Sequence, residues 1–162
     1  VNNDFLEDMY LHYHWIKKLS IKYPELRIGL KHKNYISDKK ELEIFKNSKN
    51  IFHLTNAGKE NESYHLGAKA KALCTWTSTL GYEFIGNGKD CLYLDPGGRN
   101  SAFLRKNKEN SLIRVTEYED FEFKIINMIK LDKKIVGDTL RENYCLNSQA
   151  VSRNIVEAYS QY

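Results

Sequence analysis

The stretch ALCTWTSTLGYEFIGNGKDCLYLDPGG, residues 72–98, decides the fold. It holds a short apolar run, three consecutive hydroxyl residues, a segment with helical spacing, a second apolar run and a Gly-rich turn. A helix that connects two strands forms a crossover, and such crossovers join parallel strands. We therefore expect strands at 72–76 and 90–94, with a helix at 78–87 packed on their sheet.

The same alternation runs through the rest of the chain. Apolar residues at three- and four-residue steps predict a helix at 4–22, and an apolar–polar alternation predicts a strand at 26–31. The same criteria predict helices at 37–45, 63–71 and 118–129, strands at 50–54 and 112–115, and a helical tail from residue 132. This order predicts an α/β fold, a Rossmann-like parallel sheet flanked by helices on both faces. We expect residues 1–162 to form one domain.

The composition excludes several classes of protein. No segment approaches the roughly 18 apolar residues of a membrane-spanning helix. The net charge is +4 with acidic and basic residues mixed along the chain, so nucleic acid is not an expected partner. The three cysteines lack C-x-x-C spacing, which argues against a disulfide framework or a cysteine-based zinc site. A P-loop and a complete G-x-G-x-x-G are both absent. We expect a cytoplasmic location.

Polar residues follow the predicted strands where a parallel sheet binds its ligands, beyond the carboxyl ends. Lys31 and His32 end the first strand, and an imidazole N–H and an ammonium group can both contact a phosphoryl oxygen. Thr77, Ser78 and Thr79 end the third strand. With Ser78 as N-cap and Thr79 as first helical residue, hydroxyls and first-turn amides would converge on an anion. Each residue also has an ordinary explanation, as a polar loop or a helix cap.

Further candidates surround these two strand ends. Glu83 lies one turn into the helix, where a carboxylate can accept hydrogen bonds from a ribose diol. Arg99 can clamp a diphosphate, and His53 and Asn100 can face the same crevice. The ordinary alternatives are a helix-dipole partner for Glu83, an exposed loop arginine for Arg99 and a hydrogen-bonded strand-end histidine for His53. We expect no metal site, since no Asp-x-Asp is present and His12-x-His14 is not a helical metal pair.

The motifs KHKN at 31–34 and TSTLGYEFIGNGKDCLYLDPGG at 77–98 carry a family resemblance. Together they resemble the C-terminal, donor-nucleotide-binding domain of GT-B-type glycosyltransferases of bacterial surface polysaccharide biosynthesis, such as capsule, lipopolysaccharide and teichoic acid transferases. The similar features are Lys31-His32, the pair Ser78-Thr79 followed by Glu83, and the segment from Gly88-Lys89 to Asp95. The similarity covers residues 26–100, but Lys33 stands where the family has a proline.

The resemblance implies a metal-independent glycosyltransferase that uses a CMP-, CDP- or UDP-linked sugar and no cofactor. It implies that His32, Ser78 and Thr79 contact the donor phosphate and that Glu83 holds the ribose. The acceptor would be a glycan or a lipid-linked glycan, with the full-length protein peripherally associated with the inner face of the membrane. The chain begins with Val1 and leads almost at once into a helix. We therefore expect a fragment of a longer two-domain enzyme, inactive alone, with its catalytic base in the other domain.

Two other functions fit the same residues. An NDP-sugar 2-epimerase-like domain shares the fold and the Ser/Glu crevice. A non-catalytic module that binds nucleotides or glycans would also use this fold. Nucleotide-dependent thermal shifts, polysaccharide binding and release of UDP from UDP-GlcNAc distinguish the three.

Overall fold

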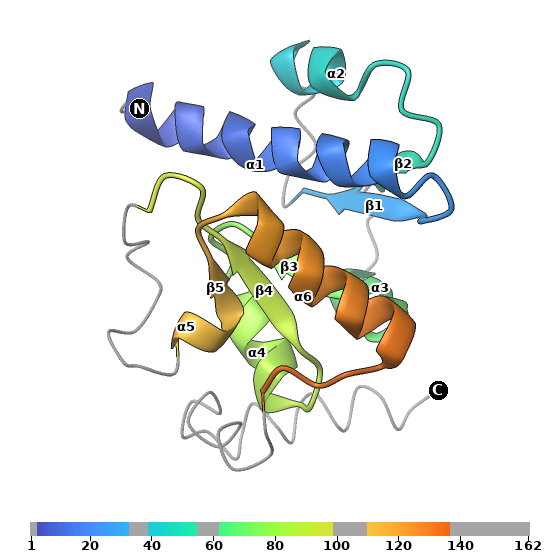
Figure 1. Cartoon of the computed structure of the whole chain (residues 1–162), viewed down its shortest axis with the longest axis vertical. Helices are drawn as coiled ribbons and strands as arrows, with labels where there is room; N and C mark the ends of the chain where they lie inside the picture. Colours follow the sequence, from blue (N-terminus) through green and yellow to red (C-terminus); the bar gives the residue numbers. More distant parts are fainter. Residues whose placement is uncertain (1–2, 33–38, 55–61, 99–109, 137–162) are drawn as a thin grey trace.

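A computed structural model describes residues 3–32, 39–54, 62–98 and 110–136 (Figure 1). In these segments the elements are α1 (Asn3–Lys22), β1 (Ile28–Lys31), α2 (Lys39–Phe45), β2 (Ile51–Leu54), α3 (Glu62–Lys69), β3 (Leu73–Thr75), α4 (Leu80–Gly86), β4 (Cys91–Leu94), α5 (Asn110–Ile113), β5 (Arg114–Val115) and α6 (Tyr118–Leu131). Each strand pairing among them is parallel. The predicted α/β class with parallel strands is confirmed.

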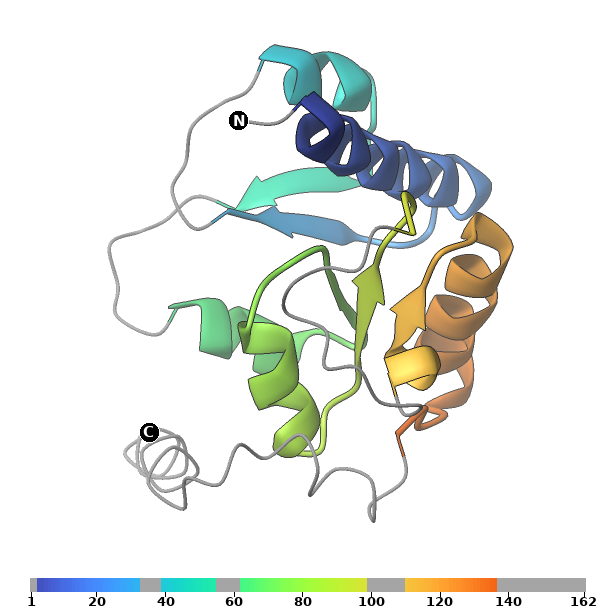
Figure 2. The ribbon, with the colours of Figure 1, turned by 90° about the vertical axis from the view of Figure 1, so that its left-hand side faces the viewer.

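The strands are divided between two small sheets. β1 pairs with β2, and β4 lies between β3 and β5 in the second sheet. In both Figure 1 and Figure 2 the strands of the first sheet run across the direction of those in the second. Helices flank both sheets, so the fold is Rossmann-like in its layers, although the described strands do not form one continuous sheet.

β4 is the centre of the second sheet, and its four residues are all buried. Leu92 and Leu94 pack in a core with residues of α1 and α6, whereas Cys91 and Tyr93 belong to a second cluster with Ile85 of α4. Alternate side chains of a strand point to opposite faces, so both faces of this strand are covered. Figure 2 shows α6 on one side of the sheet and α3 and α4 on the other. The sequence prediction of helices on both faces is confirmed for this sheet.

α1 joins the two sheets into one structure. Its buried Tyr13, Ile16 and Leu19 lie in the same core cluster as Ile51 of β2 and Leu92 of β4. At the end of α1, the Asn50 amide nitrogen donates to the carbonyls of Ser20, at 3.1 Å, and Tyr23, at 3.3 Å. Carbonyls in the last turn of a helix lack intrahelical partners, so this side chain caps α1. The cap fixes where β2 begins relative to α1.

Two predicted boundaries are wrong. The strand expected at 112–115 is a short helix, α5, followed by the two-residue strand β5. Leu112-Ile113 is an apolar pair that suits a helix or a strand equally, and periodicity cannot separate them over so few residues. The helical tail does not begin at residue 132 either, because Asp132 adopts a left-handed backbone, with φ 48°, that ends α6. Residues 137–162 lie outside the described residues. Within the described part of the chain, no helix has the length and apolar character needed to cross a bilayer.

Candidate functional site

The turn of residues 77–79, which links β3 to α4, lies at the surface. Ser78 and Thr79 are exposed and Thr77 is half-buried. Ser78 was expected to be the N-cap of α4, but the helix begins at Leu80 and Thr79 takes that position. The Ser78 hydroxyl instead accepts the N–H of Leu80 at 3.3 Å, while Thr75 Oγ1 accepts the N–H of Ser78 at 3.2 Å. The hydroxyls therefore shape the turn as well as face solvent, and the local bonds of a Ser/Thr turn replaced the predicted cap.

A buried tyrosine anchors this turn from below. Tyr93 of β4 is 0% exposed, and its hydroxyl donates to the Ser78 carbonyl at 2.8 Å. Burial raises the pKa of Tyr93, so the phenol stays protonated and remains a donor. Gly81 allows the approach, since a Cβ there would lie only 2.6 Å from the Tyr93 hydroxyl oxygen. Tyr93 thus fixes the turn, although in the sequence it stands out only as part of the apolar run of β4.

Glu83 is half-buried and already has a partner. The hydroxyl of Tyr64 in α3 donates a short hydrogen bond to its Oε2. The phenol therefore orients the Glu83 carboxylate through its Oε2 atom. The sequence placed Glu83 correctly in the first turns of α4 but gave no sign of Tyr64, which comes from a separate helix.

The residue that follows β3 contacts α1. Trp76, the residue after β3, stacks on His12 with ring centroids 6.0 Å apart. Burial lowers the pKa of His12 to about 4; the Met9 backbone opposes this shift, and the nearby His32 adds to it. The stacked pair of His12 and Trp76 therefore connects the start of the 77–79 turn to α1.

His32 itself belongs to a compact cluster. Its Nε2 lies 2.9 Å from Oε1 of the buried Glu41, and Nδ1 of His53 lies 3.3 Å from the same oxygen. The two imidazole rings are stacked with centroids 6.3 Å apart. His53 was predicted to face the same crevice as His32, and the structure brings the two together. Glu41 was missed, because in the sequence it only supports a helix and no short motif links it to either histidine.

The remaining predicted residues have other positions. Lys31 pairs with Glu62 at 3.5 Å, so its ammonium group is partly neutralised. Arg99 and Asn100 lie outside the described residues. Before them, the carboxylate of the buried Asp95 accepts hydrogen bonds from Arg114, whose guanidinium also donates to the Gly98 carbonyl at 2.9 Å. This ion pair fixes the start of the loop that leads to Arg99.

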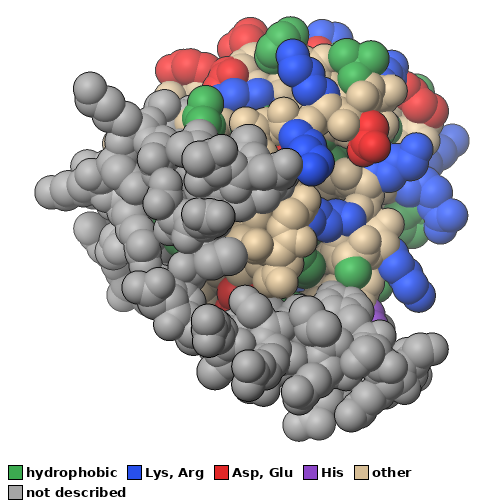
Figure 3. Space-filling view, turned by 90° about the horizontal axis from the view of Figure 1, so that it is seen from below, with side chains coloured by type: hydrophobic (Ala, Val, Ile, Leu, Met, Phe, Trp, Pro, Cys, Tyr) green, Lys and Arg blue, Asp and Glu red, His purple; other side chains and the backbone are tan. Residues whose placement is uncertain are grey.

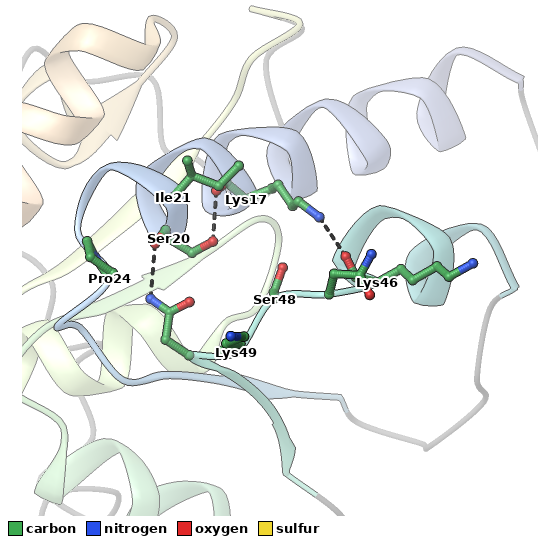
Figure 4. Close-up of a pocket in the computed structure, with 9 residues that line it drawn as sticks. Lys17, Ser20, Ile21, Pro24, Lys46, Ser48 and Lys49 are labelled. Atoms are coloured by element: carbon green, nitrogen blue, oxygen red, sulfur yellow. Dashed lines mark hydrogen bonds between the residues drawn. The ribbon is translucent and has the colours of Figure 1, made fainter.

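A pocket lies at the opposite ends of β1 and β2 and is not part of this site (Figure 4). Its lining comes from the end of α1 and the segment before β2: Lys17, Ser20, Ile21, Pro24, Lys46, Asn47, Ser48, Lys49 and Asn50. Lys17 Nζ donates to the carbonyls of Ile44, at 2.6 Å, and Lys46, at 3.0 Å. Asn50 caps α1. Lys17 and Asn50 are thus used in holding α1 against its neighbours, which argues for a structural role.

The surface charge is mixed, as the sequence predicts. On the face in Figure 3, basic side chains are spread over the described part, with acidic ones among them rather than in a separate zone. On this face, the described side chains form no concentrated basic stripe of the kind typical of nucleic-acid-binding proteins. Comparison with known proteins adds no assignment: no family model, curated protein or solved structure matches the chain.

Proposed function

We propose that the chain is the donor-binding domain of a GT-B-type glycosyltransferase acting in bacterial surface carbohydrate biosynthesis, with a nucleotide-activated sugar as its ligand. One observation carries the proposal. The exposed 77–79 turn follows β3 and is held from below by Tyr93, Trp76 beside it stacks on His12 of α1, and His32 follows β1. The ends of parallel strands are where α/β folds bind nucleotides. This arrangement favours a ligand that spans both strand ends.

The side chains suit the parts of a nucleotide-sugar diphosphate or monophosphate. Ser78 and Thr79 supply exposed hydroxyl donors for phosphate oxygens. α4 has only seven residues, so its dipole is small and the hydroxyls would carry most of the contact. Glu83, oriented by Tyr64, would accept hydrogen bonds from the ribose diol. Each group thus has a chemical partner within one ligand.

His32 would supply the hydrogen bond at the other strand end. Its Nε2 is directed at Glu41, so Nδ1 is the other ring nitrogen, and it donates to a phosphate oxygen when both ring nitrogens carry a proton. When a glycosyl bond to the nucleotide breaks, negative charge develops on the leaving phosphate. Hydrogen-bond donors fixed in advance around that oxygen stabilise the transition state. The acceptor and the catalytic base would come from a second domain of the complete enzyme.

Calorimetric titration with CMP, CDP and UDP tests the proposal. We expect saturable binding of at least one nucleotide, lost in the double variant Ser78→Ala and Thr79→Ala with the circular dichroism spectrum unchanged. Ser48→Ala removes a hydroxyl from the segment before β2, at the opposite end of that strand from the proposed site, and serves as the matched control. Equal affinity in the double variant and the parent chain would overturn the assignment of these hydroxyls.

Further outcomes separate the alternatives. Absence of binding by every nucleotide, together with binding of polysaccharide, would replace the proposal with a glycan-binding module. Release of UDP from UDP-GlcNAc by the complete protein, without transfer to an acceptor, would favour the epimerase-like function. Transfer of a sugar from a nucleotide donor to a glycan acceptor would support the glycosyltransferase directly.

A further inference from the structure

The cluster of His32, Glu41 and His53 has the composition of a metal site. Among the described residues, these three form a group whose ligand atoms all lie within 4.8 Å of one another. Each comes from a different element: His32 follows β1, Glu41 lies in α2 and His53 lies in β2. Two imidazoles and one carboxylate are a common ligand set for zinc and other divalent transition metals.

The register of the first sheet explains why the histidines meet. His53 pairs with Leu30 across the two strands. His32 is two residues beyond Leu30, so its side chain leaves the same face of the sheet. α2 packs against α1 over this face and brings in Glu41, whose side chain is 6% exposed. The three ligands are therefore placed by backbone pairing and helix packing together.

The distances agree with coordination. Ligand atoms about 2.0–2.1 Å from a tetrahedral zinc ion are roughly 3.3 Å apart. The corresponding separations here are 2.9 Å from His32 Nε2 to Glu41 Oε1 and 3.3 Å from His53 Nδ1 to the same oxygen. Small side-chain rotations would open these contacts enough to admit an ion. The side chains of His32 and His53 are 23% and 25% exposed, so solvent or a ligand can reach the cluster.

The alternative is a purely hydrogen-bonded cluster, in which both imidazoles donate to Glu41. That arrangement places the buried Glu41 carboxylate between two imidazole rings. Buried charge is costly without a compensating one. Among the described residues, Lys31 beside His32 is already paired with Glu62. Phe45 packs edge-on against His53 at 6.2 Å between ring centroids and supplies no charge. A cation at the cluster would balance Glu41 and bind both imidazole nitrogens.

We propose that His32, Glu41 and His53 bind one divalent transition-metal ion, with zinc the ion that this ligand set favours. Three protein ligands leave at least one coordination position for water or an anionic group. This departs from the sequence-based expectation of no metal site, which considered only motifs of closely spaced residues. The inference does not depend on the proposed function, although His32 belongs to both.

Titration of the metal-free chain with ZnCl₂, without nucleotide, tests the site. We expect one equivalent of zinc to bind saturably. Glu41→Gln and His53→Ala should each weaken binding at least about tenfold. His14→Ala is the matched control, since His14 is an exposed histidine of α1 and its loss should leave the affinity unchanged. Substitution by Co²⁺ should give the visible absorption of a low-coordinate complex with histidine ligands.

Two results would overturn the proposal: absence of saturable zinc binding, or equal affinity in the parent chain and both ligand variants. If a variant fails to fold, imidazole NMR signals of the parent chain decide. One equivalent of zinc must then shift the signals of His32 and His53, and shifts confined to other histidines refute the site. Because nucleotide binding is measured separately with chelator present, loss of one function does not imply loss of the other.

Discussion

Tyr93→Phe and Gly81→Ala, made singly and together, test whether one buried hydroxyl fixes the 77–79 turn. The Tyr93 hydroxyl donates to the Ser78 carbonyl at 2.8 Å. A Cβ at Gly81 would lie 2.6 Å from that hydroxyl oxygen and 2.8 Å from the ring carbon Cζ. Real Cβ atoms do not approach other atoms so closely, so alanine must displace the Tyr93 ring or the first turn of α4.

The magnitudes follow from these contacts. Phenylalanine keeps the buried ring and its contact with Tyr82, at 4.8 Å between centroids, and loses only the hydrogen bond. We expect Tyr93→Phe to lower the free energy of unfolding by about 1 kcal/mol. Gly81→Ala gains about 0.5–1 kcal/mol in helix propensity but loses about 1–3 kcal/mol to overpacking. Its net cost should be about 1–2 kcal/mol.

The double variant carries the test. Without the hydroxyl oxygen, the closest contact of the new methyl group is absent, although the contact with Cζ remains. The double variant should therefore be less destabilised than the sum of the single variants, by about 1 kcal/mol. Urea denaturation followed by circular dichroism measures all four proteins. If the two effects add within about 0.3 kcal/mol, the hydroxyl does not occupy the space that Gly81 leaves, and the account of the turn is wrong.

Two further predictions concern charged and titrating groups near the strand ends. Burial lowers the pKa of His12 to about 4. Between roughly pH 6.5 and pH 4, the unfolded chain therefore binds a proton at His12 that the folded chain does not. The free energy of unfolding should fall as the pH falls through this range. Between pH 7 and pH 5, the free energy of unfolding of the chelator-treated protein should fall by about 2 kcal/mol. The decrease should be smaller in His12→Gln, and urea denaturation at each pH measures both. Arg114→Met leaves the buried Asp95 carboxylate unpaired and should lower the free energy of unfolding by about 2–4 kcal/mol, with part of it recovered by adding Asp95→Asn. No recovery in that double variant would contradict the ion pair.

The sequence predicts those parts of the fold that local patterns determine. The twenty-residue helix α1 shows its apolar spacing clearly, and the apolar run of β4 is typical of a strand covered on both faces. The prediction failed at residues 110–115, where short apolar segments suit either state. It also could not show that the strands divide into two sheets, because the pairing of strands depends on contacts between residues far apart in the sequence.

For the candidate site, the sequence could indicate strand ends but not the residues that surround them. The ends of β1 and β3 could be found because parallel strands place polar residues at their carboxyl ends. The residues that organise them could not be found, since Tyr64, Tyr93 and Glu41 reach the site from other elements. Nothing in the sequence spacing of His32, Glu41 and His53 distinguishes them from ordinary surface residues. Only the register of β1 with β2 and the packing of α2 bring them together.

His32 connects the two proposals, and its two ring nitrogens give the connection a measurable form. A metal ion on Nε2 fixes the proton of the neutral imidazole on Nδ1, the nitrogen that would face the donor phosphate. Zinc should therefore strengthen nucleotide binding by about the worth of one hydrogen bond, roughly 0.5–1.5 kcal/mol or two- to tenfold. Linkage requires the nucleotide to tighten zinc binding by the same factor, so calorimetry in both directions must give one number. If both ligands bind and that factor is one, His32 does not serve both, and either the phosphate or the metal is held elsewhere.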